Sequence, residues 1–269
     1  MSIILLTAAT GSPGVTSTAL GLAVHWPRDV LLADCDREPG QSLQAGYLLG
    51  LDLGGRGLSE LARAHRENRP VSEELQLQTV SFQSGAEHER HVLPGFAHPA
   101  TPALFAPVWQ PLAQALRAHS DSGRGVIVDA GRIGGTGLPS ALLGASDLVL
   151  VCVRSSLRSL AALRLHLPTL QHQLDESSRA ELGLLVVGPG RPYSSSEISR
   201  QFSVPVVHEL AWEPRQAEVY SDGATPGRSW GGGQLNRSLR AAASALDERV
   251  RRREEVVAGA LATSEWVSS

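Results

Sequence analysis

Short apolar runs alternate with amphipathic stretches along almost the whole chain. The runs are too short for helices and are bounded by polar or glycine-containing segments, which is typical of buried strands. We predict strands over residues 2–7, 30–33, 92–95, 125–131, 147–153 and 183–187, and a strand that begins at residue 204 and reaches residue 212. Apolar residues at helical spacing predict helices over residues 16–25, 42–49, 58–66, 108–119, 138–143, 157–174, 194–201 and 236–252. Residues 67–87 and 228–234 lack a clear period.

The order of these elements predicts the fold class. Strands that alternate with helices are joined by right-handed crossovers, which place the strands parallel in one sheet. We therefore predict an α/β fold with a mostly parallel sheet and helices on both faces. No linker is long enough to divide the chain. We expect one domain over residues 1–250, followed by a partly disordered tail over residues 251–269.

The segment between the first strand and the first helix is rich in small residues. Residues 7–17 are Thr-Ala-Ala-Thr-Gly-Ser-Pro-Gly-Val-Thr-Ser. A strand, a small-residue turn and a helix form the setting of a phosphate-binding loop, in which backbone N–H groups and the helix N-terminus face an anion. The loop departs from the usual pattern at Val15, where a phosphate-binding lysine is expected before the Thr16 hydroxyl. Pro13 also removes one backbone donor.

Acidic residues stand at the carboxyl ends of two predicted strands. Asp34 and Asp36 follow the strand at residues 30–33, and Asp129 lies near the end of the strand at residues 125–131. Open α/β sheets bind ligands at the edge where the carboxyl ends of the parallel strands meet. We therefore expect these carboxylates to lie near the phosphate loop. Carboxylates in that position hold Mg²⁺ or orient an attacking water.

The absence of lysine limits what this loop can do. All 24 basic residues are arginine. A cationic contact to phosphate must therefore come from an arginine or a metal ion, since backbone donors carry no full charge. The arginines that follow predicted strand ends are Arg37, Arg132, Arg154 and Arg158. Losing a charge-assisted phosphate contact costs about 2–3 kcal/mol, so we expect weakened nucleotide binding and weak or no hydrolysis.

The remaining composition argues against several other classes of protein. The net charge of −3 and the pI of 6.3 give no overall field that favours nucleic acid or an anionic membrane. The basic run at residues 249–253 is flanked by glutamates, which favours a solvated helix. No apolar run approaches the roughly 20 residues of a membrane-spanning helix, and the N-terminus does not look like a signal peptide. Cys35 and Cys152 lie in or beside apolar runs, which predicts buried free thiols.

These motifs resemble the MinD/ARA group of P-loop ATPases with a deviant Walker A motif, which includes the ParA proteins. The family loop Lys-Gly-Gly-x-Gly-Lys-[Ser/Thr] corresponds to residues 10–16. Gly11, Gly14 and Thr16 are kept, while Thr10 and Val15 replace the two lysines.

The resemblance extends through roughly residues 1–245. Asp34-Cys35-Asp36 looks like the family's Asp-x-Asp, and residues 126–129 look like Walker B. Gly188 stands where an adenine-reading Asn is usual, and residues 212–214 stand where Pro-x-Asp-Pro flanks the base.

The resemblance implies a single-domain P-loop NTPase-like sandwich that binds ATP or ADP together with Mg²⁺. The implied nucleotide contacts are Gly11, Ser12, Pro13, Gly14, Val15, Thr16, Ser17, Gly188, Trp212 and Pro214. The implied Mg²⁺ contacts are Thr16, Asp34 and Asp129, and Asp36 falls on the catalytic carboxylate.

The resemblance also implies a function. MinD/ParA proteins position other assemblies in the cell, and the TadZ/CpaE pilus-assembly branch includes atypical loops. The leading hypothesis is a cytoplasmic homodimer, recruited to a cell pole or the inner membrane face, that localises a pilus or secretion assembly and is at most a weak ATPase. One alternative is an active ParA-like ATPase for chromosome or plasmid partition or septum placement, with ATP-dependent DNA binding. Another is a dimeric scaffold that binds no nucleotide.

Overall fold

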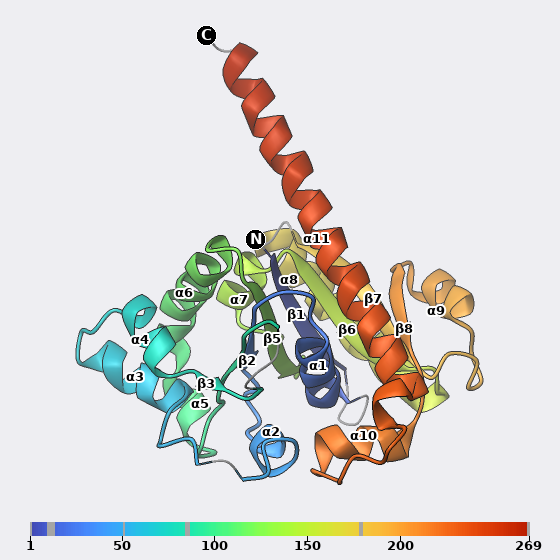
Figure 1. Cartoon of the computed structure of the whole chain (residues 1–269). Helices are drawn as coiled ribbons and strands as arrows, with labels where there is room; N and C mark the ends of the chain where they lie inside the picture. Colours follow the sequence, from blue (N-terminus) through green and yellow to red (C-terminus); the bar gives the residue numbers. More distant parts are fainter. Residues whose placement is uncertain (1, 10–13, 51, 84–86, 178–179, 268–269) are drawn as a thin grey trace.

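The computed structural model of the chain describes residues 2–9, 14–50, 52–83, 87–177 and 180–267. The strands in these ranges form one sheet with the order β3-β4-β2-β5-β1-β6-β7-β8 (Figure 1). They are β1 (Ser2–Ala8), β2 (Val30–Asp34), β3 (Val80–Ser81), β4 (Arg90–Leu93), β5 (Gly125–Arg132), β6 (Leu148–Arg154), β7 (Glu181–Val187) and β8 (Val206–Leu210). Only the pair β3–β4 is antiparallel, so the predicted α/β fold with a mostly parallel sheet is confirmed.

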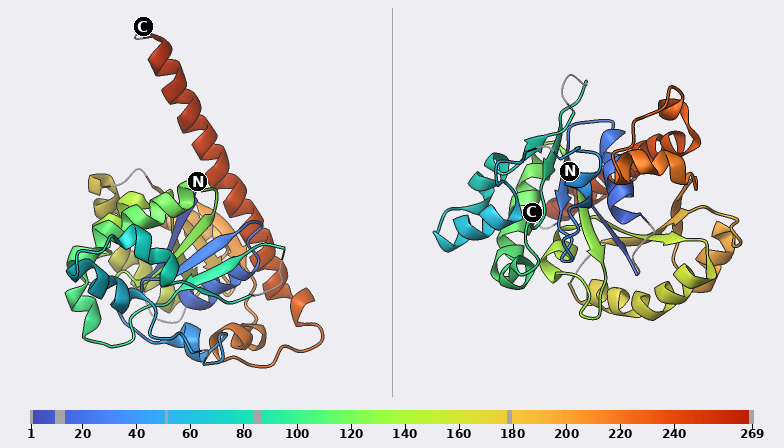
Figure 2. Two further views of the ribbon diagram at one scale, coloured as in Figure 1. Left: turned by 60° about the vertical axis from the view of Figure 1, so that its left-hand side comes forward. Right: turned by 90° about the horizontal axis from the view of Figure 1, so that it is seen from below.

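Helices cover both faces of this sheet. They are α1 (Val15–Val24), α2 (Ser42–Ala45), α3 (Leu58–Arg66), α4 (Val71–Leu77), α5 (Thr101–Leu104), α6 (Trp109–Asp121), α7 (Ser140–Ala145), α8 (Leu157–Ser177), α9 (Ser195–Phe202), α10 (Pro214–Ser221) and α11 (Gln234–Val267), with short 3₁₀ turns η1 (Ala106–Val108) and η2 (Trp230–Gly232). Figures 1 and 2 show α1, α10 and α11 on one side of the sheet and α6, α7 and α8 on the other.

The central strand β1 supplies both apolar layers of the core, because side chains alternate between the faces of a strand. Ile3 and Leu5 belong to the cluster that contains the buried faces of α6, α7 and α8. Ile4 and Leu6 belong to the cluster that contains α1 and α11. Both cysteines are buried and free, as expected.

Helix α11 is longer than the sequence predicts. Its buried stripe is spaced as an amphipathic helix requires and packs into the same cluster as α1; the stripe consists of Leu235, Leu239, Ala242, Ala243, Leu246 and Val250. Beyond this stripe the helix continues to Val267, and Figure 1 shows that part standing clear of the sheet and the other helices. No helix in the described part of the chain is long and apolar enough to cross a membrane.

Four other helices and the smallest strand differ from the sequence prediction. Helix α2 ends at Ala45 rather than residue 49; the next residue, Gly46, lies so close to α10 that a Cβ there would be 2.5 Å from the Ser221 carbonyl oxygen. The polar stretch at residues 67–87 contains α4 and β3. Helices α5 and α10 are too short to give a clear apolar period.

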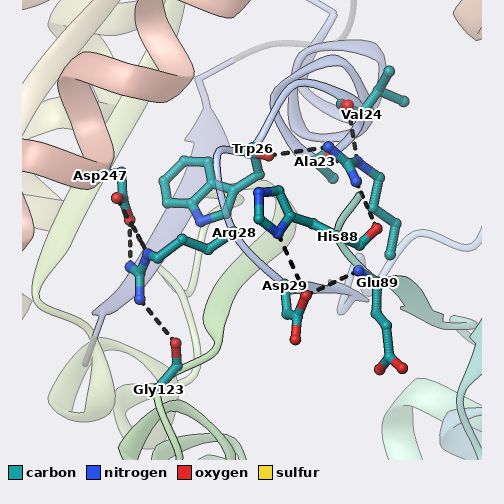
Figure 3. A network of polar contacts seen from close by, with 10 residues as sticks. Ala23, Val24, Trp26, Arg28, Asp29, His88, Glu89, Gly123 and Asp247 are labelled. Atoms are coloured by element: carbon teal, nitrogen blue, oxygen red, sulfur yellow. Dashed lines mark hydrogen bonds and ion pairs between the residues drawn. The ribbon is translucent and has the colours of Figure 1, made fainter. Parts of the chain in front are cut away.

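Buried arginine contacts fix the carboxyl end of α1 (Figure 3). The Arg90 guanidinium, in a side chain that is 8% exposed, donates from Nε to the carbonyls of Ala23 and Val24 and from Nη2 to that of Trp26. Free carbonyls at the end of a helix favour such a cation. Arg28, in the following loop, pairs with Asp247 on α11. These contacts hold the helix whose other end carries the phosphate loop.

Candidate functional site

The site is organised around the N-terminus of α1. Gly14 precedes the helix with φ of 81°, a left-handed conformation that suits glycine. Among the described residues no side chain caps this end, and the first turn contains no acidic residue, which favours an anion at its N–H groups. Gly11, Ser12 and Pro13 lie outside the described residues, whereas Gly14, Val15, Thr16 and Ser17 lie within them.

Val15 is the residue where the loop departs most from a phosphate-binding pattern. Its side chain is 8% exposed and belongs to the apolar cluster beneath α1. At this position only its backbone N–H is suited to meet a phosphate. The apolar residue at this position is therefore matched by the packing around it.

The three predicted carboxylates meet on one side of the α1 N-terminus. Asp34 and Asp129 are direct neighbours in the register of β2 and β5. The Asp36 backbone N–H donates to Asp34 Oδ1 at 3.3 Å. The Asp36 carboxyl lies against the backbone of Gly131, where a Cβ would be 2.1 Å from Asp36 Oδ1. The sequence therefore placed these carboxylates correctly at one edge of the sheet.

Asp129 is the most deeply buried of the three, with a side chain that is 1% exposed. Its Oδ1 accepts a hydrogen bond from the Gly131 N–H at 2.9 Å. Its Oδ2 has no hydrogen-bond partner among the described residues. A buried carboxylate oxygen without a partner is costly, and a bound cation would compensate that cost.

The electrostatics of the cluster favour protonation when no cation is bound. Burial and the neighbouring Asp129 raise the pKa of Asp34 to about 8. Burial raises the pKa of Asp129 to about 6, against hydrogen bonds from the Thr16 side chain and the Gly131 N–H. Burial also raises the pKa of Asp36. The three pKa values are raised for a shared reason: the carboxyls lie close together in a poorly solvated place, and no lysine neutralises them.

The donor set fits Mg²⁺ held by few protein ligands. Within the described ranges, no group of three or more His, Cys, Asp or Glu is arranged as a complete metal cage. Mg²⁺ does not need one, since it usually keeps several waters and takes one or two carboxylates plus substrate phosphates. Thr16 and Asp129 interact directly, and the unpartnered Oδ2 of Asp129 provides an oxygen ligand.

A cavity of about 330 Å³ opens on the other side of the α1 N-terminus. Gly14, Ser17 and Thr18 line it from α1, and Trp212 and Pro214 line it from the segment after β8. Its remaining walls are mostly apolar and include Leu210, Tyr220, Leu235 and Leu239. The shape and polarity suit a flat ring placed next to a helix N-terminus.

Gly188 is not one of the residues that line this cavity, but it packs against Trp212, which is. It has φ of 69°, and a Cβ at this position would be 2.9 Å from the Trp212 Cβ. The Trp212 Cβ therefore takes the space that a side chain at position 188 would need. The Arg154 guanidinium lies over the Trp212 ring, 3.7 Å from its centre.

Two of the four arginines at strand ends are held by contacts within the protein. The Arg37 guanidinium donates to the backbone carbonyls of Ile133 and Gly137. Arg132 pairs with Glu38. Arg158 lies exposed on the first turn of α8. Arg154 is therefore the strand-end arginine placed beside the cavity, which spacing in the sequence could not distinguish.

Tyr220 of α10 belongs to no motif in the sequence. Its ring lines the cavity, and its hydroxyl donates to Asn236 Oδ1. Asn236 also contacts His25 at 2.9 Å, which connects the cavity wall to the end of α1. A single tyrosine on a short helix gives no signal in the sequence that it belongs to a site.

Comparison with known proteins agrees with this arrangement at the level of the fold. No protein-family model and no curated protein matches the sequence. The structure is similar to a ParA family ATPase from Chlorobium tepidum, at 14% identity, with 90% of this chain and 98% of that chain covered and a TM-score of 0.68. It is similar to MinD in the MinC:MinD cell division complex of Aquifex aeolicus, at 17% identity, with 92% and 96% covered and a TM-score of 0.67.

A further similar structure is the septum site-determining protein MinD from Pyrococcus horikoshii, complexed with Mg-ADP. It is 17% identical, with 91% of this chain and 96% of that chain covered and a TM-score of 0.67. At these identities the likeness defines the fold, which is that of the MinD and ParA ATPases.

Proposed function

We propose that this protein binds ATP or ADP with Mg²⁺ at the α1 N-terminus and hydrolyses ATP weakly or not at all. The observation that carries the proposal is the buried, unpartnered Oδ2 of Asp129 beside Thr16. An apolar cavity for a base opens on the other side of the same helix end. The similar MinD from Pyrococcus horikoshii is complexed with Mg-ADP.

The residues divide into three groups in this proposal. The phosphates take the backbone N–H groups of residues 11–17 apart from Pro13, which has none. Thr16, Asp34 and Asp129 serve the Mg²⁺, which neutralises phosphate charge when bound. Trp212 and Pro214 contact the base, and Gly188 contributes by admitting Trp212. The Asp36 carboxyl lies against Gly131, whose N–H donates to Asp129. Asp36 is the carboxyl available to orient a water.

Slow hydrolysis follows from the missing charge. Phosphoryl transfer depends on groups that stabilise charge developing on the phosphoryl oxygens. Both lysines of the family loop are absent, and no lysine exists elsewhere in the chain. Binding needs less positive charge than catalysis does, because backbone donors and Mg²⁺ still contact the phosphates of the bound, unreacted ATP.

For the cellular role, we propose a positioning factor for a pilus or secretion assembly that acts as a homodimer with a partner protein of that assembly. The support is the fold of the MinD and ParA ATPases combined with a loop that departs from the lysine-containing pattern. A weak ATPase is better suited to long-lived placement than to rapid cycling.

Calorimetric titration with ATP and Mg²⁺ tests the nucleotide proposal. We expect binding by the natural chain, and a loss of the Mg²⁺-dependent part of the affinity in Asp129→Ala. The matched control is Asp121→Ala, which removes an exposed carboxylate at the end of α6. Gly14→Val should also weaken binding, because φ of 81° is strained for valine.

The outcomes separate the alternatives. No heat and no thermal shift with millimolar ATP would favour the scaffold without nucleotide. Phosphate release at many turnovers per minute would favour an active ParA-like ATPase. Binding that is equal in Asp129→Ala and the natural chain would contradict the proposed Mg²⁺ site.

A further inference from the structure

We propose that Arg154 is the cation that contacts the nucleotide phosphates in this protein, with Trp212 as the platform that holds it. This inference rests on the proposed nucleotide site. It assigns to an arginine on a neighbouring strand the task that a loop lysine performs in the family pattern, and it makes Arg154 a determinant of affinity for phosphorylated over unphosphorylated ligands.

The sheet topology brings Arg154 to the phosphate loop. β6 pairs with β1 on the side away from β5, and Val151 is the register partner of Thr7. Arg154 lies three residues beyond Val151, toward the carboxyl edge. The phosphate loop leaves β1 at that same edge. An arginine at the end of β6 therefore lies on the strand next to β1, at the edge of the sheet where α1 begins.

The contacts of Arg154 leave its charge available. Its guanidinium makes no hydrogen bond or ion pair with any described residue, and its contact is the stack over Trp212 at 3.7 Å from the ring centre. Stacking uses the face of the guanidinium and leaves the N–H groups at its edge free. Those groups form the planar fork that binds two phosphate oxygens at once.

Trp212 connects this cation to the ligand cavity. Its ring lines the cavity together with Gly14 and Ser17 of α1. Arg154 is therefore placed next to a residue that lines the same cavity as the N-terminus of α1. A long side chain that is already ordered by stacking loses less conformational entropy when it binds.

Two small residues maintain this arrangement. Gly188 leaves the space that the Trp212 Cβ occupies. The Ser155 hydroxyl donates to the Gly188 carbonyl and accepts from the Arg191 N–H at 3.0 Å, which ties the end of β6 to the loop after β7. Gly188, where the family pattern has Asn, thus makes room for Trp212. Trp212 in turn supports Arg154, which takes the place of the loop lysines in this proposal.

The test compares ATP with adenosine, in the presence of Mg²⁺, by calorimetry and by quenching of tryptophan fluorescence. Arg154→Ala should weaken ATP binding by about 30-fold or more, and should change adenosine binding by less than about threefold. Arg154→Lys should recover part of the ATP affinity because it restores the charge. The control is Arg164→Ala, which removes an exposed arginine two turns after the start of α8. It should change neither affinity.

Each other outcome overturns the inference in a recognisable way. An equal loss of ATP and adenosine affinity in Arg154→Ala would mean that Arg154 only supports Trp212. An unchanged ATP affinity would mean that the guanidinium does not meet the phosphates. If the natural chain binds adenosine but gains nothing from the phosphates of ATP, Arg154 has no phosphate to hold. If it binds neither ligand, the proposed function itself is wrong.

Discussion

Val15 stands at the position of a phosphate-binding lysine, yet its side chain is packed into the apolar cluster beneath α1. Asp129, on the adjoining strand end, keeps a buried oxygen without a partner. One side of the site thus presents a buried apolar side chain, while the other presents a buried carboxylate. A bound Mg²⁺ would balance this excess of negative charge, and so would protonation of the carboxyls.

Restoring the lysine is the first test at the residue scale. We expect Val15→Lys to tighten ATP binding by about 30- to 150-fold, because a charge-assisted contact adds about 2–3 kcal/mol. It should also lower the free energy of unfolding by about 1 kcal/mol, since it removes a buried apolar side chain. Calorimetry and urea unfolding measure the two effects. Val15→Met, which lengthens the side chain without charge, is the control; equal affinities of the two variants would contradict the expected loop geometry.

Gly188 gives a second prediction, on packing. Gly188→Asn should lower the free energy of unfolding by about 1–3 kcal/mol, because its Cβ would meet Trp212 at 2.9 Å. Gly190→Asn has a similar φ of 75° but open space around its Cβ, so it should cost less than about 1 kcal/mol. Urea unfolding compares them. Equal losses would show that backbone strain, rather than contact with Trp212, explains the glycine.

Asp34 gives a prediction on pH. Its pKa is about 8 in the folded chain and about 4 when unfolded, so the folded state holds the proton more tightly. The contribution of Asp34 to the stability of the ligand-free protein is therefore greatest below about pH 4 and is lost as the pH rises toward 8. Asp34→Asn should flatten this decline and be more stable than the natural chain at pH 8, as measured by urea unfolding between pH 5 and 8.

The control for that measurement is Asp175→Asn, which changes an exposed aspartate near the end of α8. It should leave the pH profile as it is. A decline of the same steepness in Asp34→Asn and in the natural chain would mean that Asp34 does not cause it.

At the scale of elements, α1 matters most, because its N-terminus orients the phosphate loop. Its other end is held by Arg90, which donates to three α1-terminal carbonyls. We expect Arg90→Ala to lower the free energy of unfolding by about 2–4 kcal/mol, since it leaves buried carbonyls without donors. Arg66→Ala, at an exposed position on α3, should change it by less than about 0.5 kcal/mol. Urea unfolding measures both, and similar small effects would show that Arg90 does not anchor the helix.

The sequence predicted the long elements because their apolar period is strong. The central strands are continuous buried runs, and α8 and the first part of α11 carry a clear amphipathic stripe. The short elements α4, α5, α10 and β3 escaped prediction, since each has at most two buried residues, which define no period. The extension of α11 to Val267 stands clear of the sheet and the other helices (Figure 1), and the sequence predicted the helix only to residue 252.

The candidate site was predictable where it depends on strand ends and unpredictable where it depends on contacts between strands. Asp34, Asp36 and Asp129 were placed by topology alone, because carboxyl ends of parallel strands share an edge. The stack of Arg154 on Trp212 joins the ends of β6 and β8, which are not neighbours in the sheet. No spacing in the sequence reports such a pair.

At the scale of the whole molecule, the basic run on α11 bears on the ParA-like alternative. Arg249 and Arg253 both reach Glu181 of β7, and Arg252 pairs with Glu248. These arginines are engaged within the protein, which leaves little charge to neutralise phosphates of DNA. The homodimer and the domain boundary at residue 250 stay predictions at this scale.

We therefore expect no ATP-dependent DNA binding. Fluorescence polarisation with labelled duplex DNA at low and moderate salt measures it, with and without ATP and Mg²⁺. Arg249→Ala should leave the signal unchanged. Binding that appears with ATP and weakens steeply as salt rises would contradict this expectation and support a partition function.

The central claim is that the α1 N-terminus, without any lysine, still holds a nucleotide and Mg²⁺. A crystal structure with Mg²⁺ and a non-hydrolysable ATP analogue tests it most directly. The account predicts phosphates at the N-terminus of α1, Mg²⁺ between Thr16 and Asp129, and the base in the cavity against Trp212. A nucleotide bound elsewhere, or an α1 N-terminus without phosphate at millimolar analogue, would contradict it.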